Sequence, residues 1–142
     1  MRLSMITRCM VVALFCIGSA PAYAADAATN FICTFKAGST LSYTNAKFKR
    51  AIAKPLAFDI GSIDLAGQKA ELVTPKGRGE LKIVRALNAN HFLEVVAEGF
   101  LNITTVYDFD ATAKAHPAVH SRHFGLFGEP VVAQYQGFCT SK

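Results

Sequence analysis

Three of the four histidines of this 142-residue chain lie in one short segment near its end. His116, His120 and His123 are separated by three and by two residues in the sequence HPAVHSRH. Imidazoles that converge on one point can bind zinc or copper, and Asp108 or Asp110 could add a carboxylate ligand. The spacing matches no standard metal motif, so a metal site at these three histidines is an alternative and not the main prediction.

The same segment contains the parts of a hydrolase. Ser121 beside a histidine and an aspartate could act as a nucleophile with its base, but the G-x-S-x-G turn that exposes a catalytic serine is missing. We therefore predict no enzymatic activity and favour a structural role, in which these side chains bond loop carbonyls. Arg122 is of most interest, because an arginine among apolar residues can reach inward to a carboxylate or to carbonyls. The candidate binding loop comprises His116, His120, Ser121, Arg122 and His123.

The candidate binding loop is predicted to belong to the longest connection of the chain, residues 111–130. Most connections in compact domains are about five residues long, and long ones are usually functional or lid-like. This one contains apolar residues such as Phe124 and Leu126, which favour packing over disorder. We therefore predict a lid packed over one end of the fold, in which Pro117 could begin a short helix.

Period-two alternation of apolar and polar residues recurs along the remaining chain, and no long segment keeps a helical period. It is clearest at residues 101–110, where Leu101 and Ile103 share one face and Asn102 and Thr104 the other, so we expect the apolar face to point inward. Strands are expected at residues 30–37, 41–49, 56–60, 63–65, 69–74, 81–87, 91–97, 101–110 and 131–139, with turns at residues 38–39, 61–62, 66–68, 75–79 and 88–90.

This pattern predicts an all-β fold, either a single small antiparallel β-barrel or a sandwich, of about eight strands. Cys33 lies in the first expected strand and Cys139 in the last, and both face inward. An even pair of cysteines in an exported chain indicates a disulfide. We therefore expect the N- and C-terminal strands to be adjacent and joined by a bond that stabilises the fold by roughly 4 to 5 kcal/mol in the chain-entropy model.

The start of the chain has the features of a secretory signal peptide, expected at residues 1–24. A basic region precedes an apolar run at residues 10–17, and small residues end at Ala22-Tyr23-Ala24. The run is shorter than the roughly 20 residues that cross a bilayer, and no later segment approaches that length. We expect an exported protein, periplasmic or extracellular, whose residues 25–142 form one domain without a transmembrane segment.

The charge of the chain is mildly basic. A net charge of +5 at pH 7 is too small to indicate binding to nucleic acid, and export excludes that partner. Five cations and no acid occur between Lys36 and Lys54. A solvated face is the favoured interpretation, with attraction to an anionic envelope surface as the alternative.

The chain combines the expected leader with Phe31-Ile32-Cys33-Thr34-Phe35, the stretch PAVHSRH at residues 117–123 and QYQGFC at residues 134–139. This layout resembles that of small exported bacterial proteins of unknown function. It also resembles, more loosely, the periplasmic inhibitors of C-type lysozyme, which are small β-barrels, although their Ser-Gly-x-x-Tyr loop is not found here. A lipocalin-like carrier has a comparable architecture, but the G-x-W signature is missing and the chain has no tryptophan.

Taken together, the sequence predicts an exported, non-catalytic binding or envelope-interaction module without a cofactor. Its partner is expected to be an envelope protein or a small ligand. Two alternatives remain open at this point. One is a metal-binding protein that uses His116, His120 and His123, and the other is a carrier of a small apolar ligand inside the barrel.

Overall fold

The computed structural model describes residues 30–96, 99–126 and 129–142, so the expected signal peptide lies outside the described residues. The described residues form nine β-strands and no helix, which confirms the all-β prediction. The strands are β1 (Phe31–Thr44), β2 (Lys47–Ile52), β3 (Leu56–Asp64), β4 (Lys69–Thr74), β5 (Gly77–Arg85), β6 (Ala89–Val96), β7 (Phe100–Tyr107), β8 (His116–Leu126) and β9 (Glu129–Ser141).

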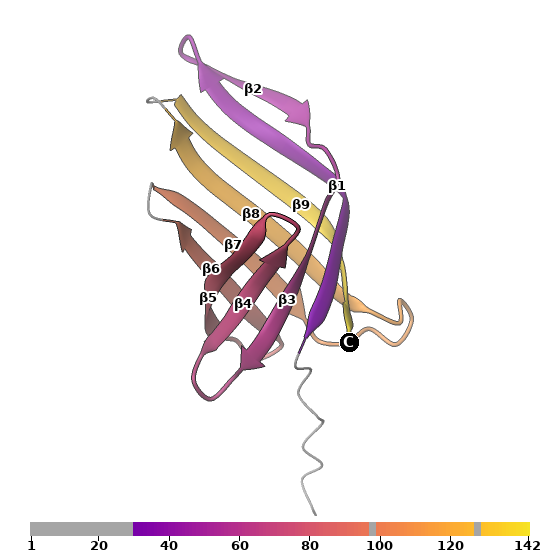
Figure 1. Cartoon of the computed structure of the whole chain (residues 1–142). Helices are drawn as coiled ribbons and strands as arrows, with labels where there is room; N and C mark the ends of the chain where they lie inside the picture. Colours follow the sequence, from indigo (N-terminus) through magenta and orange to yellow (C-terminus); the bar gives the residue numbers. More distant parts are fainter. Residues whose placement is uncertain (1–29, 97–98, 127–128) are drawn as a thin grey trace, which may run out of the picture.

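Eight of the strands close into an antiparallel barrel, and β2 is added outside it. The order is β2-β1-β3-β4-β5-β6-β7-β8-β9, and β9 pairs again with β1. Along one edge, residues 31–35 of β1 pair with β3 and residues 39–44 pair with β2. Figure 1 shows the consequence: β8, β9 and the second half of β1 extend beyond the β3–β4 hairpin toward β2.

The disulfide between Cys33 and Cys139 joins the first barrel strand to the last, as predicted. The two residues face each other directly in the β1–β9 register, and both are fully buried. They belong to the core cluster, which includes Phe31, Phe35 and Ile60. The bond therefore lies at the seam where the barrel closes.

The predicted turn at residues 38–39 is wrong, because β1 continues through it. The register with β9 shifts between Thr34 and Ala37, which is a β-bulge. Gly38 is needed for close approach and not for a turn, since a Cβ there would lie 2.7 Å from Cδ1 of Tyr135. At Gly137 a Cβ would collide with the carbonyl oxygen of Thr34. These glycines let the two strands cross closely at the seam.

Other boundaries also differ from the sequence prediction. The predicted strand at residues 41–49 contains a hairpin turn at Asn45 and Ala46, whose φ angles of 52° and 59° are typical of a two-residue hairpin loop. The predicted break at residues 61–62 is absent because β3 passes through it, with a register shift between Gly61 and Asp64. The expected strands at residues 56–60 and 63–65 are therefore one strand.

The predicted lid at residues 111–130 is also wrong. Most of this segment is the strand β8, which pairs with β7 on one side and with β9 on the other. Pro117 lies near the start of β8, where a strand tolerates proline, and begins no helix. Among the described residues of this segment, only 111–114 form a turn. The histidine-rich segment is thus part of the barrel wall.

The faces of β7 are opposite to those predicted from the sequence. Thr104 is 4% exposed and Val106 is 2% exposed, so the face that carries Asn102 and Thr104 points inward. Leu101 and Tyr107, on the other face, are 36% and 40% exposed. The barrel therefore has polar groups inside this part of its wall, and they mark the candidate site.

Candidate functional site

Inward-facing residues of neighbouring strands lie directly opposite one another, so the interior of the barrel is built in rows. The deepest row of the candidate site runs through Phe92, Thr104, His120 and Tyr135 on β6, β7, β8 and β9. The next row toward the opening runs through Glu94, Asn102, Arg122 and Ala133 on the same strands. We call the space lined by this second row and the strand ends beside it the barrel mouth.

His120 is the buried polar centre of the deepest row. It is 4% exposed, and its Nδ1 lies 2.8 Å from Oγ1 of Thr104. Its ring is surrounded by aromatic rings, with centroid distances of 5.1 Å to Phe58, 5.7 Å to Phe35 and 5.9 Å to Tyr135. Such surroundings disfavour a charged imidazole.

Arg122 fixes the proton position on His120. Its Nε donates a hydrogen bond to Nε2 of His120 at 3.1 Å, so Nε2 must carry a lone pair. The imidazole proton is then on Nδ1 and is donated to Thr104. Burial, and secondarily the positive charge of Arg122, lower the pKa of His120 from 6.5 to about 4. His120 is therefore neutral at pH 7 and acts as a fixed acceptor for the arginine.

The guanidinium of Arg122 extends from this anchor into the barrel mouth. Its central carbon lies 5.9 Å from the ring centroid of Tyr135, so the aromatic face supports the cation from one side. Among the described residues the one ion pair is Arg78 with Glu71, at 2.7 Å, so Arg122 has no carboxylate partner there. Its two terminal nitrogens have no hydrogen bond to a described residue. The mouth therefore contains a partly buried cation with unused donors.

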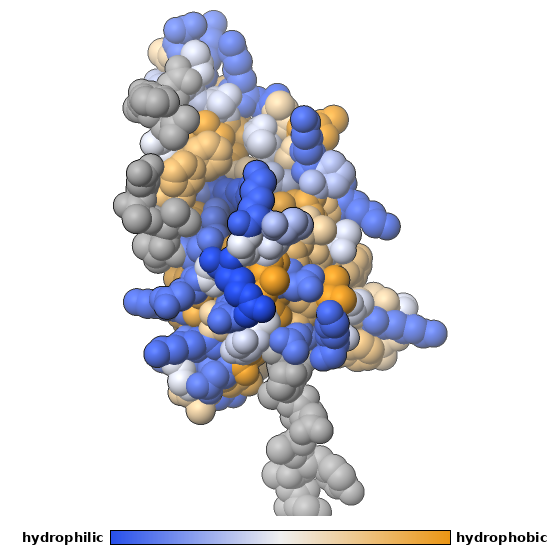
Figure 2. Space-filling model, viewed as in Figure 1, coloured by the Kyte–Doolittle hydropathy of each residue, from blue (hydrophilic) through white to orange (hydrophobic). Residues whose placement is uncertain are grey.

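A cavity of about 360 Å³ occupies the barrel mouth. Asn102 and Glu94 lie beside Arg122 in it, and Nδ2 of Asn102 donates to Oε2 of Glu94 at 2.6 Å. Gly79 leaves room for the carboxylate, since a Cβ there would lie 3.0 Å from Oε1 of Glu94. Figure 2 shows the surface hollowed above the β4–β5 turn, with hydrophilic side chains inside the hollow. The lining residues are Leu72, Thr74, Lys76, Gly77, Arg78, Gly79, Glu94, Asn102 and Arg122.

On β7, β8 and β9 the next inward residue beyond the Arg122 row is apolar. Phe100 of β7 stacks on Phe124 of β8, with ring centroids 5.4 Å apart. Val131 of β9 is the register partner of Phe124. All three side chains are only partly buried. From the interior outward, the wall thus presents a neutral histidine, then a cation, then an apolar rim.

The structure brings together only part of the predicted binding loop. His120 and Arg122 meet inside the barrel, whereas Ser121 and His123 occupy the alternate, outward positions of β8. His116 lies at the start of β8 as the register partner of Cys139, where its Nδ1 donates to the backbone oxygen of Tyr107 at 2.8 Å. The three histidines therefore do not converge. Within the described ranges, no three His, Cys, Asp or Glu side chains are grouped so that they could hold a metal ion.

Sequence reasoning missed Glu94, Asn102, Thr104 and Tyr135 as site residues. Each has an ordinary residue type at an ordinary strand position, and only the register between strands aligns it with His120 or Arg122. One feature of the sequence pointed to two of them: Asn102 and Thr104 lie two residues apart, so they share one face of a strand whose other face carries Leu101 and Ile103.

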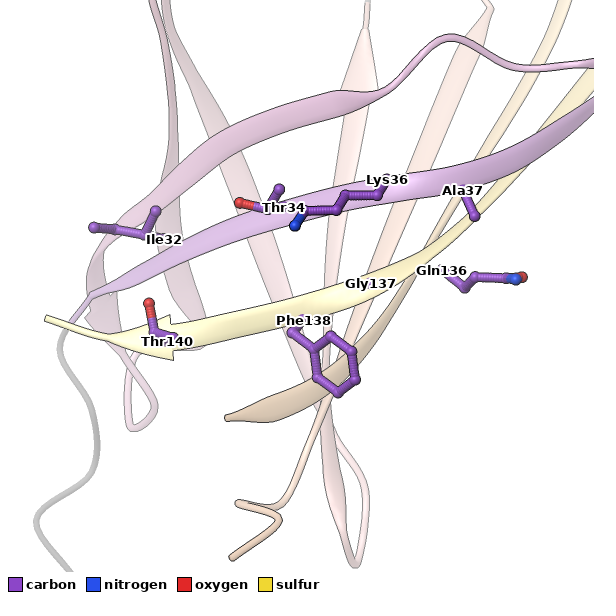
Figure 3. A pocket seen from close by; sticks show the side chains of 8 residues that line it. All are labelled: Ile32, Thr34, Lys36, Ala37, Gln136, Gly137, Phe138 and Thr140. Carbon is purple, nitrogen blue, oxygen red and sulfur yellow. The ribbon is translucent and has the colours of Figure 1, made fainter. Parts of the chain in front are cut away.

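A groove of about 610 Å³ lies on the outer wall, where β1 and β9 pair (Figure 3). Its apolar part includes Ile32 and Phe138, which are 40% and 50% exposed. Figure 3 shows the side chain of Lys36 lying along β1 toward Thr34. Its one charged lining residue, Lys36, is exposed, whereas Arg122 in the barrel mouth is partly buried. It is lined by Ile32, Thr34, Lys36, Ala37, Gln136, Gly137, Phe138 and Thr140.

Fold and site together define a small, disulfide-closed antiparallel β-barrel with a cationic mouth. No protein-family model, no curated protein and no solved structure matches the chain. In the described part of the chain, no helix is long and apolar enough to cross a membrane. The function must therefore be inferred from the geometry of the barrel mouth.

Proposed function

We propose that this protein is an exported, non-catalytic binding module that holds a small amphipathic carboxylate in its barrel mouth. The observation that carries the proposal is Arg122, whose Nε is held by a neutral His120 while its terminal nitrogens line a cavity without a described carboxylate partner. A preorganised arginine of this kind loses little side-chain entropy when it binds an anion.

The chemistry of the mouth favours a carboxylate over a more highly charged anion. Two terminal nitrogens of a guanidinium form a planar fork that matches the two oxygens of a carboxylate. Of the three cations in the lining, Arg78 is paired with Glu71, and Glu94 offsets one of the other two, Lys76 and Arg122, so one net positive charge remains for a monoanion. Asn102, whose Nδ2 is bonded to Glu94, retains its amide oxygen for a hydroxyl or amide of the ligand.

The apolar rim of the mouth would contact an apolar part of the ligand. Phe100, Phe124 and Val131 lie on the outer side of the Arg122 row and are only partly buried. A ligand whose carboxylate reaches Arg122 would therefore pass its hydrocarbon or aromatic body along these side chains. Burial of that body would add roughly 0.8 kcal/mol per CH₂ group.

The absence of catalysis is part of the proposal. His120 is the base candidate nearest the mouth, but both of its ring nitrogens are engaged, by Thr104 and by Arg122. A histidine with a pKa of about 4 is a weak base at neutral pH. Its role in binding is to position Arg122.

Export is supported by the predicted leader and by the disulfide, which is consistent with an oxidising compartment. The compartment we propose is the periplasm or the extracellular space. There a small stable barrel would bind its ligand as a free module or pass it to an envelope protein.

The proposal is tested with octanoate and octanol, a pair of probes that differ in the carboxylate. Calorimetry on the mature protein is expected to detect octanoate and to show much weaker binding of octanol. Replacing Arg122→Gln should weaken octanoate binding by roughly ten- to a hundredfold, as expected for loss of a charge-assisted hydrogen-bond pair. The matched control Arg50→Gln, which removes an equal charge from the exposed strand β2, should leave it unchanged. Equal octanoate affinity in the Arg122 variant and the wild type would refute the proposal.

A further inference from the structure

Strand β2 has a neighbour on only one side. It stands at the end of the sheet order, next to β1, while each of the other eight named strands pairs with at least two others. All six of its residues are exposed. Figure 1 shows β2 beside the far half of β1, away from the β3–β4 hairpin. The barrel is therefore closed everywhere among the named strands except at the edge of β2.

The register identifies the backbone groups at this edge. In an antiparallel hairpin with a two-residue loop, the pair that flanks the loop is hydrogen-bonded and the following pairs alternate. Thr44 and Lys47 flank the loop, so residues 47, 49 and 51 bond to β1. Ala53 continues this alternation, because its N–H donates to the oxygen of Gly38 at 3.0 Å. The N–H and C=O groups of Phe48, Arg50 and Ile52 therefore point away from the barrel.

The charge of the edge selects what can pair with it. Lys47, Lys49 and Arg50 are cationic, and residues 30–58 contain no Asp or Glu. Lysines on an edge strand oppose pairing with neutral or basic strands. A second copy of this chain would bring the same three cations to the edge, so self-pairing is disfavoured. An acidic strand would instead be attracted by the three cations that repel a basic strand or a second copy of the chain.

Apolar side chains alternate with the charge on the outer face of β2. Phe48 is 65% exposed and Ile52 is 92% exposed, and Arg50 lies between them. The ring of Phe48 is braced against Tyr43 at a centroid distance of 4.8 Å. An added strand would place its own apolar side chains beside Phe48 and Ile52. The complementary sequence is therefore an acidic segment with apolar residues at the two positions that face Phe48 and Ile52.

We propose that the edge of β2 binds an extended acidic segment of a partner protein by strand addition. Backbone bonds to Phe48, Arg50 and Ile52 supply the pairing, and Lys47, Lys49 and Arg50 supply the selectivity for acidic residues. This is the β-augmentation mode of peptide recognition. The surface is separate from the barrel mouth and does not depend on ligand binding there.

The test uses blocked peptides long enough to pair with the six residues of β2. One peptide has Glu at the positions that face Lys47, Lys49 and Arg50 and Val at the positions that face Phe48 and Ile52, and the second peptide has Lys in place of each Glu. The acidic peptide should bind the mature protein and shift the amide NMR signals of Phe48, Arg50 and Ile52, and the basic peptide should not. Equal binding of both peptides, or shifts confined to residues of the outer groove such as Phe138, would overturn the proposal.

Two variants at one position separate backbone pairing from charge. Arg50→Pro removes an outward N–H without removing a bond to β1, because position 50 is not hydrogen-bonded to that strand. Arg50→Gln keeps the N–H and loses only the charge. The proline variant should weaken acidic-peptide binding by about tenfold or more and the glutamine variant by only about threefold. Equal losses in the two variants would contradict strand addition.

The oligomeric state tests whether a second copy of the chain pairs with the edge of β2 in place of an acidic segment. Analytical ultracentrifugation of the mature protein should show a monomer at low and high salt. A dimer that Arg50→Pro converts to a monomer would show that a second copy occupies the edge, and would overturn the proposal. Unfolding midpoints of the two variants close to that of the wild type would confirm that any loss of peptide binding is local.

Discussion

Lowering the pH should destabilise the barrel through His120. At pH 7 the imidazole is neutral in both the folded and the unfolded chain. As the pH falls below 6.5 the unfolded chain binds a proton at this residue, whereas the folded protein resists it down to its pKa of about 4. Because the unfolded state then binds more protons, the free energy of unfolding decreases as the pH falls through this window, and His120 contributes no further change below it.

The magnitude follows from the pKa shift and from the burial of the ring. At about 1.4 kcal/mol per pKa unit, the difference between 6.5 and about 4 amounts to about 3 kcal/mol. His120 is only 4% exposed, so solvent screens little of this effect. Protonation would also place a second donor and a like charge against Nε of Arg122, which breaks the bond that positions the guanidinium.

The assay is urea unfolding of the disulfide-intact protein between pH 7 and pH 4. Carboxylates titrate over the same range, so the informative quantity is the difference between the wild type and His120→Gln, which cannot titrate at this position. The wild type should lose about 3 kcal/mol more than the variant. The control His123→Gln removes an exposed histidine from the outward face of the same strand and should follow the wild type. Parallel pH dependences in wild type and His120→Gln would refute the reasoning.

Three further perturbations follow from the geometry of the mouth and the seam. Glu94→Gln should strengthen octanoate binding by roughly three- to tenfold in calorimetry, because it removes a negative charge from the cavity that Arg122 lines. Gly137→Ala should lower the free energy of unfolding in urea by about 2 kcal/mol or more, since its Cβ meets the backbone of β1, whereas Gly125→Ala has open space and should change it by less than about 0.5 kcal/mol. Replacing Cys33 and Cys139 together by alanine should lower the urea midpoint by an amount equivalent to roughly 4 to 5 kcal/mol, because the bond closes a separation of 106 residues.

The barrel and its closure could be predicted because they depend on simple patterns. Period-two alternation requires only that one face of each strand be buried, and it survives errors in the strand boundaries. Two inward-facing cysteines in the first and last strands then fix which strands meet. The turn at residues 38–39 was misplaced because a glycine that permits close approach, as Gly38 does against Tyr135, cannot be told from a turn glycine without the partner strand.

The strand β8 could not be recognised from its own sequence. Its inward positions carry Ala118, His120 and Arg122, and its outward positions carry Val119 and Ser121, so apolar and polar residues occur on both faces. Backbone hydrogen bonds to β7 and to β9 hold β8 in place, so the strand does not depend on alternating apolar and polar residues. Its contribution to the site also depends on register, because the same residues shifted by one position would present Ser121 and His123 to the interior.

The reversed faces of β7 connect the fold to the site. Alternation identifies two faces but does not say which one is buried, and hydropathy gave the wrong answer because Asn102 and Thr104 point inward. A polar face can be buried only where its groups find partners, and here Thr104 binds His120 while Asn102 binds Glu94. Because Asn102 and Thr104 occupy the inward positions of β7, Leu101 lies on the outer wall and is 36% exposed. A strand whose polar face is buried in this way indicates a lined cavity and not a filled core, and β7 is the strand that supplies the polar wall beside Arg122.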